Sequence, residues 1–269
     1  MITAGIDMGS RTVKVVFLEE LSAPDAPQLK WGVKGKHIMF PDELDMDEAA
    51  EKALNDGLAA AGLQREQINR VVSTGVGRKQ VRFAHDNVTE VASGARGAVF
   101  MCPTARTVID VGAEEGRGLK ASAEGRAIDF AGNEKCAAGA GAFAESMARA
   151  LQLSLKDFGD ASLRSDKVIP MNAQCTVFAE SEVVSLIHSS IPKEDIAKSV
   201  LDAVASRVCA MVRRVGIDGD VILIGGMVNN AGFVQSLKLS LGIDQIKLPE
   251  MPEYISALGA ALIAAEHTA

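Results

Sequence analysis

The sequence predicts an α/β protein built from two lobes. Two apolar strands each lead to an aspartate and then, two residues later, a glycine: Asp7 with Gly9, and Asp110 with Gly112. Elsewhere, segments with apolar residues at helical spacing alternate with short β-branched runs, a pattern typical of α/β proteins. We interpret the two strand-Asp-x-Gly units as an internal repeat. Each copy is expected to open one lobe, because 269 residues suffice for two lobes with a cleft between them.

The amino-terminal part of the chain is expected to begin with a hairpin. Residues 2–18 indicate a strand, a glycine turn and a second strand rather than a helix. This order excludes a P-loop or Rossmann start, since both need a helix directly after the glycine loop. Further along, a strand is predicted over 31–40, an amphipathic helix over 46–61 and a strand over 68–73.

Helices dominate the prediction for the carboxyl-terminal part. Apolar spacing predicts helices over 177–189 and 193–214, followed by a buried strand over 221–224. The small-residue stretch 256–266 is expected to form a final helix that packs on a lobe, because it is too short to span a membrane.

Composition narrows the classes of function. The net charge of −7, the pI near 5.2 and the 4% aromatic content argue against nucleic-acid binding. The amino terminus lacks the basic and apolar regions of a secretory signal, and no apolar run has the length of a membrane span. We therefore expect a cytoplasmic protein with neither nucleic-acid nor membrane partners. Its four cysteines should be reduced or metal-bound rather than disulfide-paired.

The two Asp-x-Gly turns are candidate phosphate sites. Asp7 and Asp110 could each hold a hydrated Mg²⁺, while turn N–H groups, including those at Gly9 and Gly112, meet phosphate oxygens. If the two strands face each other across a cleft, they would bracket the phosphates. One copy alone would more often be a structural turn, but two copies favour a nucleotide site.

Other candidate nucleotide contacts lie beside these turns and in a later glycine pair. Ser10 and Lys14 would add a hydroxyl and a cation, although Lys14 could equally be a solvated strand residue. Gly225 and Gly226 let the backbone approach a flat ring closely, and we include the nearby Asn229 in this site. The alternative is a tight connection between a strand and a helix.

Two cysteines are candidate metal ligands. Cys136 and Cys175 each precede a segment expected to be helical, where unpaired N–H groups and the helix dipole favour a thiolate. Two thiolates are half of a tetrathiolate site, so a second chain would have to supply the rest. The alternative is simple burial, because their spacing matches no short zinc motif. Cys102 and Cys209 are expected to be buried apolar residues.

These motifs resemble a known ATPase superfamily. Gly-Ile-Asp-x-Gly-Ser, the second Asp-x-Gly, the glycine pair and the final Ala-Leu-Gly-Ala-Ala are similar to acetate kinases, sugar kinases, Hsp70 and actin. Thr-Gly-x-Gly-Arg (74–78) and the two cysteine segments (133–139 and 175–182) resemble the BadF/BadG/BcrA/BcrD branch within it. The resemblance implies two RNase H-like subdomains around a nucleotide cleft: 1–103 with 253–269, and 104–252.

The resemblance also implies a function. Members of this branch bind ATP and Mg²⁺, and two chains share one [4Fe–4S] cluster, for which Cys136 and Cys175 would be this chain's ligands. Asp7 and Asp110 would have the catalytic roles. Glu90 also lies in a family-like motif, but a solvated or salt-bridged role is the better expectation for it.

One departure favours a particular member of the branch. The dehydratase activators read Asp-Ile-Gly-Gly-Gln-Asp-x-Lys at the second loop, whereas this chain reads Asp-Val-Gly-Ala-Glu-Glu-Gly-Arg (110–117). The sequence therefore most resembles the D-type component of ATP-dependent benzoyl-CoA reductase. Its partners would be a related A-type ATPase chain, two further subunits that reduce the aromatic ring, and ferredoxin as electron donor. The alternatives are a homodimeric 2-hydroxyacyl-CoA dehydratase activator and a small-molecule kinase of the superfamily.

Overall fold

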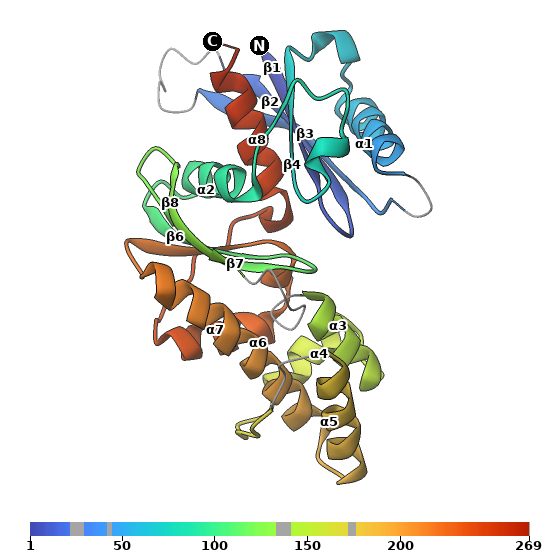
Figure 1. The fold of residues 1–269 in the computed structure, drawn as a ribbon, viewed down its shortest axis with the longest axis vertical. Coiled ribbons are helices and arrows are strands. Elements are labelled where there is room, and N and C mark those ends of the chain that lie inside the picture. The colour runs from blue at the N-terminus through green and yellow to red at the C-terminus, as the bar shows by residue number, and fades with distance from the viewer. Residues whose placement is uncertain (22–29, 42–44, 133–140, 172–175, 269) are drawn as a thin grey trace. The chain divides into compact units, whose positions relative to one another are not determined.

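The structure is a computed structural model that describes residues 1–21, 30–41, 45–132, 141–171 and 176–268. The chain divides into two compact units (Figure 1). The first comprises Met1–Pro103, Ala121–Ala127 and Glu253–Ala269, and the second comprises Thr104–Lys120 and Ile128–Pro252.

The first unit is a mixed sheet covered by helices on both faces. Its strand order is β3-β2-β1-β4-β5, with β1 antiparallel to β2 and parallel to β4. The main elements are β1 (Ile2–Met8), β2 (Val13–Glu20), β3 (Trp31–Met39), α1 (Met46–Ala61), β4 (Arg70–Thr74), β5 (Asp86–Asn87), α2 (Glu90–Met101) and α8 (Ile255–Glu266). Short 3-10 turns occur at Arg65–Gln67, Arg78–Gln80 and Pro252–Tyr254.

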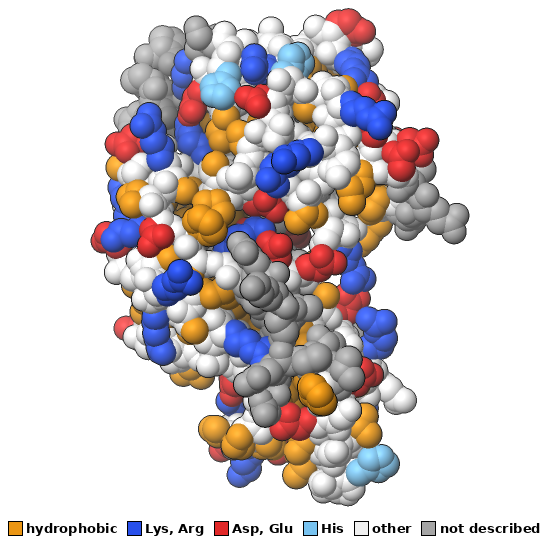
Figure 2. All heavy atoms as spheres, in the orientation of Figure 1, with side chains coloured by type: hydrophobic (Ala, Val, Ile, Leu, Met, Phe, Trp, Pro, Cys, Tyr) orange, Lys and Arg blue, Asp and Glu red, His pale blue; other side chains and the backbone are white. Residues whose placement is uncertain are grey.

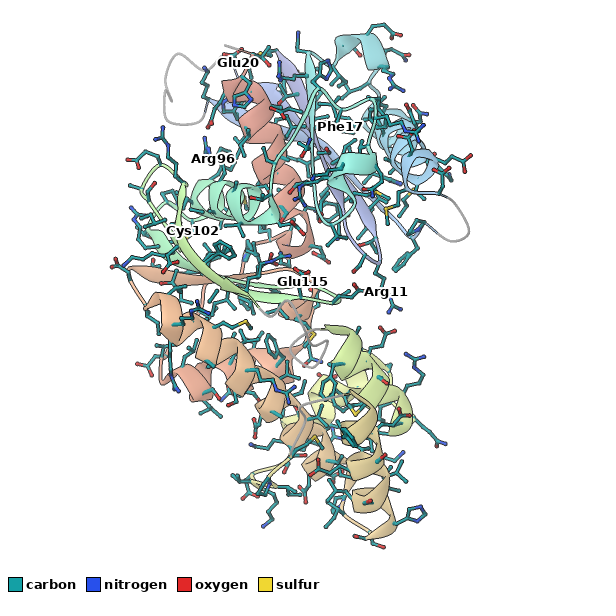
Figure 3. The ribbon with its side chains drawn as sticks, in the orientation of Figure 1. Arg11, Phe17, Glu20, Arg96, Cys102 and Glu115 are labelled. Carbon is teal, nitrogen blue, oxygen red and sulfur yellow. The ribbon has the colours of Figure 1, made fainter. Side chains whose placement is uncertain are left out.

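Alternation along β1 assigns its residues to the two faces of this sheet. Ala4 and Ile6 belong to the apolar cluster formed with α1, and so does the neighbouring Phe17 of β2 (Figure 3). The intervening positions meet α8, where the Thr3 hydroxyl donates to the Ala261 carbonyl at 2.9 Å. Asp7 therefore shares the α8 face of β1, at the end of the strand.

Helix α8 is covered on nearly all sides because it lies between the sheet and α2. A Cβ atom on Gly5 would lie 1.9 Å from the Ala257 carbonyl oxygen, and one on Gly259 would lie 1.8 Å from that of Ser93. Both positions therefore require glycine, because the backbones approach too closely for any side chain. This packing confirms the prediction that the final helix packs on a lobe.

The second unit repeats the strand arrangement of the first. Its sheet has the order β8-β7-β6-β9, with β6 antiparallel to β7 and parallel to β9. The strands are β6 (Ala105–Val111), β7 (Gly116–Ala121), β8 (Ala127–Gly132) and β9 (Asp220–Ile224). The helices are α3 (Gly141–Ala150), α4 (Leu155–Ser162), α5 (Thr176–His188), α6 (Lys193–Val215) and α7 (Ala231–Leu241), with the 3-10 turn η4 at Gly226–Asn229.

The core of the second unit lies between its sheet and α6. Ile109 and Val111 of β6 join an apolar cluster that includes residues of α3, α4, α6 and α7. Gly118 of β7 allows the close approach of α6, since a Cβ there would lie 2.9 Å from the Val212 Cα. Asp110 alternates with Ile109 and Val111, so it lies on the opposite face of the sheet.

The turn between β7 and β8 groups with the first unit, whereas the boundaries expected from the sequence place it in the second subdomain. Gly125 in this turn has a φ of +77°, and a Cβ there would lie 3.1 Å from the Arg96 Cα of α2. The turn groups with the first unit because it packs closely against α2.

No helix in the part of the chain that the structure describes combines the length and apolar character needed to cross a membrane. Figure 2 shows cationic and anionic side chains interspersed over the visible face.

Candidate functional site

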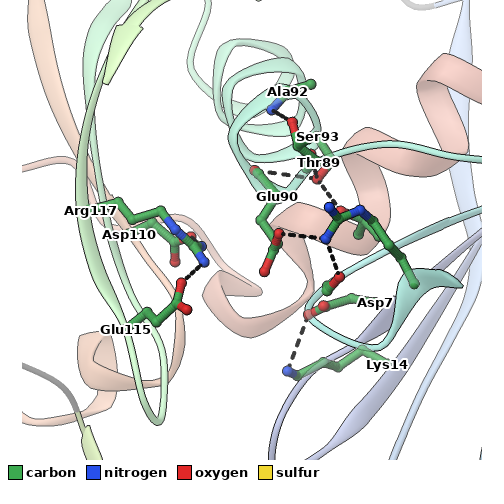
Figure 4. Close-up of polar contacts among 12 residues, drawn as sticks. Asp7, Lys14, Thr89, Glu90, Ala92, Ser93, Asp110, Glu115 and Arg117 are labelled. Atoms are coloured by element: carbon green, nitrogen blue, oxygen red, sulfur yellow. Dashed lines mark hydrogen bonds and ion pairs between the residues drawn. The ribbon is translucent and has the colours of Figure 1, made fainter. Parts of the chain in front are cut away.

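The first candidate site begins at the hairpin of β1 and β2. Asp7 and Lys14 are direct cross-strand partners, and the Lys14 Nζ donates to the Asp7 Oδ2 at 3.2 Å (Figure 4). The connecting loop is closed by the Gly9 N–H, which bonds the Thr12 carbonyl at 3.2 Å. Ser10 lies exposed in this loop. The expected hairpin is thus confirmed, and Lys14 contacts the predicted aspartate rather than being only solvated.

Gly75 lies directly beside Asp7. It follows β4, whose last residue Thr74 is the parallel-strand partner of Asp7. Gly75 has a φ of +93°, and a Cβ on it would lie 2.4 Å from the Met8 carbonyl oxygen and 2.7 Å from the Asp7 Oδ1. Any side chain here would therefore displace the aspartate.

Arg78 connects Gly75 to the start of α2. Its Nη1 donates to the Gly75 carbonyl at 3.0 Å and to the Glu90 carboxylate at 3.4 Å. Nearby, the hydroxyls of Thr74 and Ser93 are 2.9 Å apart in a buried position. The motif 74–78 thus supports the backbone next to Asp7, and the salt-bridged role expected for Glu90 is confirmed.

The second candidate site repeats this hairpin in β6 and β7. Asp110 and Arg117 are direct cross-strand partners, and the Arg117 Nη1 donates to the Asp110 Oδ2 at 3.2 Å. The Gly112 N–H bonds the Glu115 carbonyl at 2.9 Å, which closes the loop as in the first hairpin. The guanidinium of Arg117 also bonds the Glu115 carboxylate (Figure 4).

The predicted glycine pair lies beside Asp110. Gly225 follows β9 with a φ of +89°, and a Cβ on it would lie 2.4 Å from the Val111 carbonyl oxygen and 3.0 Å from the Asp110 Oδ1. Gly225 is therefore the counterpart of Gly75. A Cβ on Gly226 would meet no atom within 4 Å, so its backbone is open to approach. Gly226 begins η4 and Asn229 ends it.

The side chains and backbone of each hairpin are suited to binding a phosphate group together with Mg²⁺. Mg²⁺ is usually bound through one or two carboxylates, with water and substrate phosphates filling the other positions. Each hairpin offers one largely buried aspartate beside a cation and a glycine loop. Gly75 and Gly225 leave bare backbone next to these aspartates, where a side chain would otherwise intrude. These features fit ATP with Mg²⁺.

Asn230 fixes the start of α7, and the predicted site does not include it. It is buried, and its Oδ1 accepts the Phe233 N–H at 2.9 Å, which caps α7. Its Nδ2 donates to the Leu155 carbonyl at 3.2 Å. An asparagine directly before an apolar helical pattern is a recognisable cap signal, so this role was accessible from the sequence.

The candidate cluster ligands Cys136 and Cys175 lie outside the described residues. Within the described ranges, no group of three or more His, Cys, Asp or Glu residues could hold a metal ion. Cys209 is buried as predicted, and burial raises its pKa to about 11. Cys102 is only half-buried, because it ends α2 at the surface rather than lying in the core.

Comparison with known proteins identifies the family. Residues 4–264 match the model of the BadF/BadG/BcrA/BcrD ATPase family. The chain belongs to this family. Its fold is that of the superfamily of sugar kinases, Hsp70 and actin, as predicted. A ROK hexokinase from Thermus thermophilus shares that fold at a TM-score of 0.55 and 14% identity, over 99% of both chains.

More similar proteins include dehydratase activators and a reductase component. The activator of lactoyl-CoA dehydratase from Anaerotignum propionicum is 36% identical, over 99% of this chain and 98% of its own length. The crystal structure of (R)-2-hydroxyglutaryl-CoA dehydratase component A from Acidaminococcus fermentans is 32% identical, with a TM-score of 0.91, over 100% of this chain and 99% of its own. The D-type component of benzoyl-CoA reductase from Thauera aromatica is 31% identical, over 97% and 92%.

Proposed function

We propose that this family member is an ATP-dependent electron activator of a 2-hydroxyacyl-CoA dehydratase. The observation that carries the proposal is the full-length similarity to the lactoyl-CoA dehydratase activator, at 36% identity. That identity exceeds the 31% shared with the D-type component of benzoyl-CoA reductase. The comparisons thus support a dehydratase activator better than the reductase component that the second-loop motif favours.

The two hairpins support the nucleotide part of the proposal. Asp7 and Asp110 would hold hydrated Mg²⁺ and orient phosphate, and Lys14 would offset phosphate charge. The N–H groups of Gly9 and Gly112 already bond the Thr12 and Glu115 carbonyls, so these two glycines would shape the turns, and the Ser10 N–H is the proposed phosphate contact. For the base, the proposed contacts are the open backbone of Gly226, the adjoining Gly225 and Asn229.

The electron-transfer part depends on the cysteines. Cys136 and Cys175 would supply half the ligands of a [4Fe–4S] cluster shared with a second chain, and a bound cluster supplies the low-potential electron. Helix α5, which follows Cys175, exposes apolar side chains: Phe178 is 71% exposed, and Val184 and Ile187 are also exposed. Exposed apolar residues on a helix next to a shared ligand support pairing there.

A D-type component of benzoyl-CoA reductase is the second candidate. It is favoured by the acidic second loop, where Glu114 and Glu115 replace the Gln-Asp of the dehydratase activators. In that case the second chain would be a related A-type ATPase, ring reduction would occur on two further subunits, and ferredoxin would supply electrons. The proposed activator would instead pair with a second copy of itself.

Anaerobic purification of the chain expressed alone tests the proposal. We expect iron and sulfide equivalent to half a [4Fe–4S] cluster per chain, a dimer in solution, and MgATP hydrolysis. Cys136→Ser and Cys175→Ser should lose the iron, whereas the matched control Cys102→Ser should retain it. Iron that is unchanged in Cys136→Ser would contradict the cluster assignment.

The same preparation separates the two candidates. An isolated chain without iron, which gains iron only when expressed with a related ATPase chain, would favour the reductase component. Activation of a purified 2-hydroxyacyl-CoA dehydratase by the homodimer would support the proposed activator. Phosphorylation of a sugar or acetate without bound iron would instead indicate a kinase.

A further inference from the structure

The two hairpins differ in the charge around an otherwise equivalent pair. The Asp7–Lys14 and Asp110–Arg117 contacts are both 3.2 Å, and the four side chains are 11–15% exposed. The loops are closed by equivalent backbone bonds, from Gly9 to Thr12 and from Gly112 to Glu115. Position 12 is a threonine, however, whereas position 115 is a glutamate whose carboxylate bonds the cation of its own hairpin.

This difference changes the electrostatics of the second loop. In the first hairpin one cation faces one carboxylate, so the pair is neutral. In the second, Arg117 contacts both Asp110 and Glu115, so these three side chains together carry one negative charge. Glu115 is 37% exposed, so solvent screens its charge only partly. An approaching phosphate meets repulsion there, and it also finds the guanidinium already bound to two carboxylates.

We propose that Glu115 makes nucleotide binding at the second loop conditional on a divalent cation. Without the cation, Glu115 holds Arg117 and repels the phosphates. A divalent cation bound with the nucleotide offsets the excess carboxylate charge, so Arg117 can share its donors with a phosphate oxygen. This inference rests on the proposed function, namely that the hairpin binds nucleotide phosphate.

The geometry distinguishes Glu115 from its neighbour Glu114. Glu115 projects from the loop at the end of the hairpin (Figure 3) and contacts Arg117 directly. Glu114 carries the same charge one residue away, but it is exposed to solvent. The dependence of nucleotide binding on a divalent cation should therefore come from Glu115 and not from the general acidity of the loop, because exposed charges are screened by water and salt.

Nucleotide titration of this chain tests the inference. The dissociation constant of ATP is measured by calorimetry with excess Mg²⁺ and again with EDTA, for the wild type, Glu115→Gln and the matched control Glu114→Gln. We expect Glu115→Gln to tighten Mg²⁺-free binding roughly tenfold, and to shrink the ratio of the two constants by the same factor. Glu114→Gln should leave that ratio within about twofold of the wild type.

The outcomes separate this inference from the proposed function. If the wild type binds ATP but both variants shift the ratio equally, or Glu115→Gln shifts nothing, Glu115 has no specific role and the inference fails alone. If the wild type binds no ATP under either condition, the proposed function fails and the inference fails with it. Circular dichroism of both variants ensures that folded proteins are compared.

Discussion

Replacing Gly75 by alanine would place a methyl group against both the backbone and the proposed catalytic carboxylate of the first unit. The new Cβ would lie 2.4 Å from the Met8 carbonyl oxygen and 2.7 Å from the Asp7 Oδ1, at a φ of +93°. The backbone strain alone costs about 1–3 kcal/mol. Because one of the opposing atoms belongs to the backbone of a buried strand, the contact cannot be relieved by rotating a side chain.

Gly62→Ala is a matched control in the same unit. Gly62 also has a positive φ, +64°, but a Cβ there would meet no atom within 4 Å. Its cost should therefore be the left-handed strain alone, about 1 kcal/mol. Gly75→Ala should add the steric clash and reach about 3 kcal/mol in total. The difference between the two variants measures the clash together with any larger backbone strain at Gly75.

Thermal unfolding and nucleotide binding together measure this effect. At roughly 2–4 °C per kcal/mol, Gly62→Ala should lower Tm by roughly 2–4 °C and Gly75→Ala by roughly 6–12 °C. Gly75→Ala should also weaken MgATP binding roughly tenfold or more, because the Asp7 carboxylate is displaced. The reasoning would be refuted if Gly75→Ala melted like Gly62→Ala and bound MgATP like the wild type.

Three further substitutions or treatments test separate parts of the structure. Asp7→Asn should abolish Mg²⁺-dependent ATP hydrolysis while leaving the iron content of anaerobically purified protein unchanged; hydrolysis at the wild-type rate would exclude the proposed role of Asp7. Asn230→Ala removes the cap of α7 and the donor to the Leu155 carbonyl, so it should cost about 1–3 kcal/mol in urea unfolding, and a cost near zero would contradict the buried cap. Burial raises the pKa of Cys209 to about 11, so between about pH 9 and pH 11 the folded state keeps a thiol proton that the unfolded state loses. The free energy of unfolding should therefore fall as pH rises through this window. Mass spectrometry after brief alkylation at pH 8 should find Cys209 unlabelled in the native protein and labelled in urea, whereas rapid native labelling would count against its burial.

The elements that the sequence predicts well carry their own boundary signals. Helix α1 has the predicted bounds, because the Asp45 side chain accepts the Asp47 and Glu48 N–H groups and Gly62 ends the helix in a left-handed conformation. The repeated Asp-x-Gly also predicts equivalent strands, which the matching pairing of β1 and β6 confirms. In both cases a short sequence motif was sufficient to predict the element.

Strand β7 depends instead on contacts between distant residues. It contains Gly116 and Gly118, which weaken a local strand signal. Gly118 is needed because α6 approaches closely at Val212, far along the chain. The pairing of Arg117 with Asp110 likewise depends on strand register, which a periodicity pattern does not determine. A signal was nevertheless present, since a cation follows each aspartate by seven residues.

The equal length of the two hairpin loops has a consequence for engineering the protein. In each hairpin the strand pairing resumes after four loop residues, 9–12 in one and 112–115 in the other. Gly-Ser-Arg-Thr and Gly-Ala-Glu-Glu can therefore be exchanged without shifting any strand residue to the opposite face. A single chain thus offers two interchangeable loops, through which the charge beside either aspartate can be varied while the strand framework stays the same.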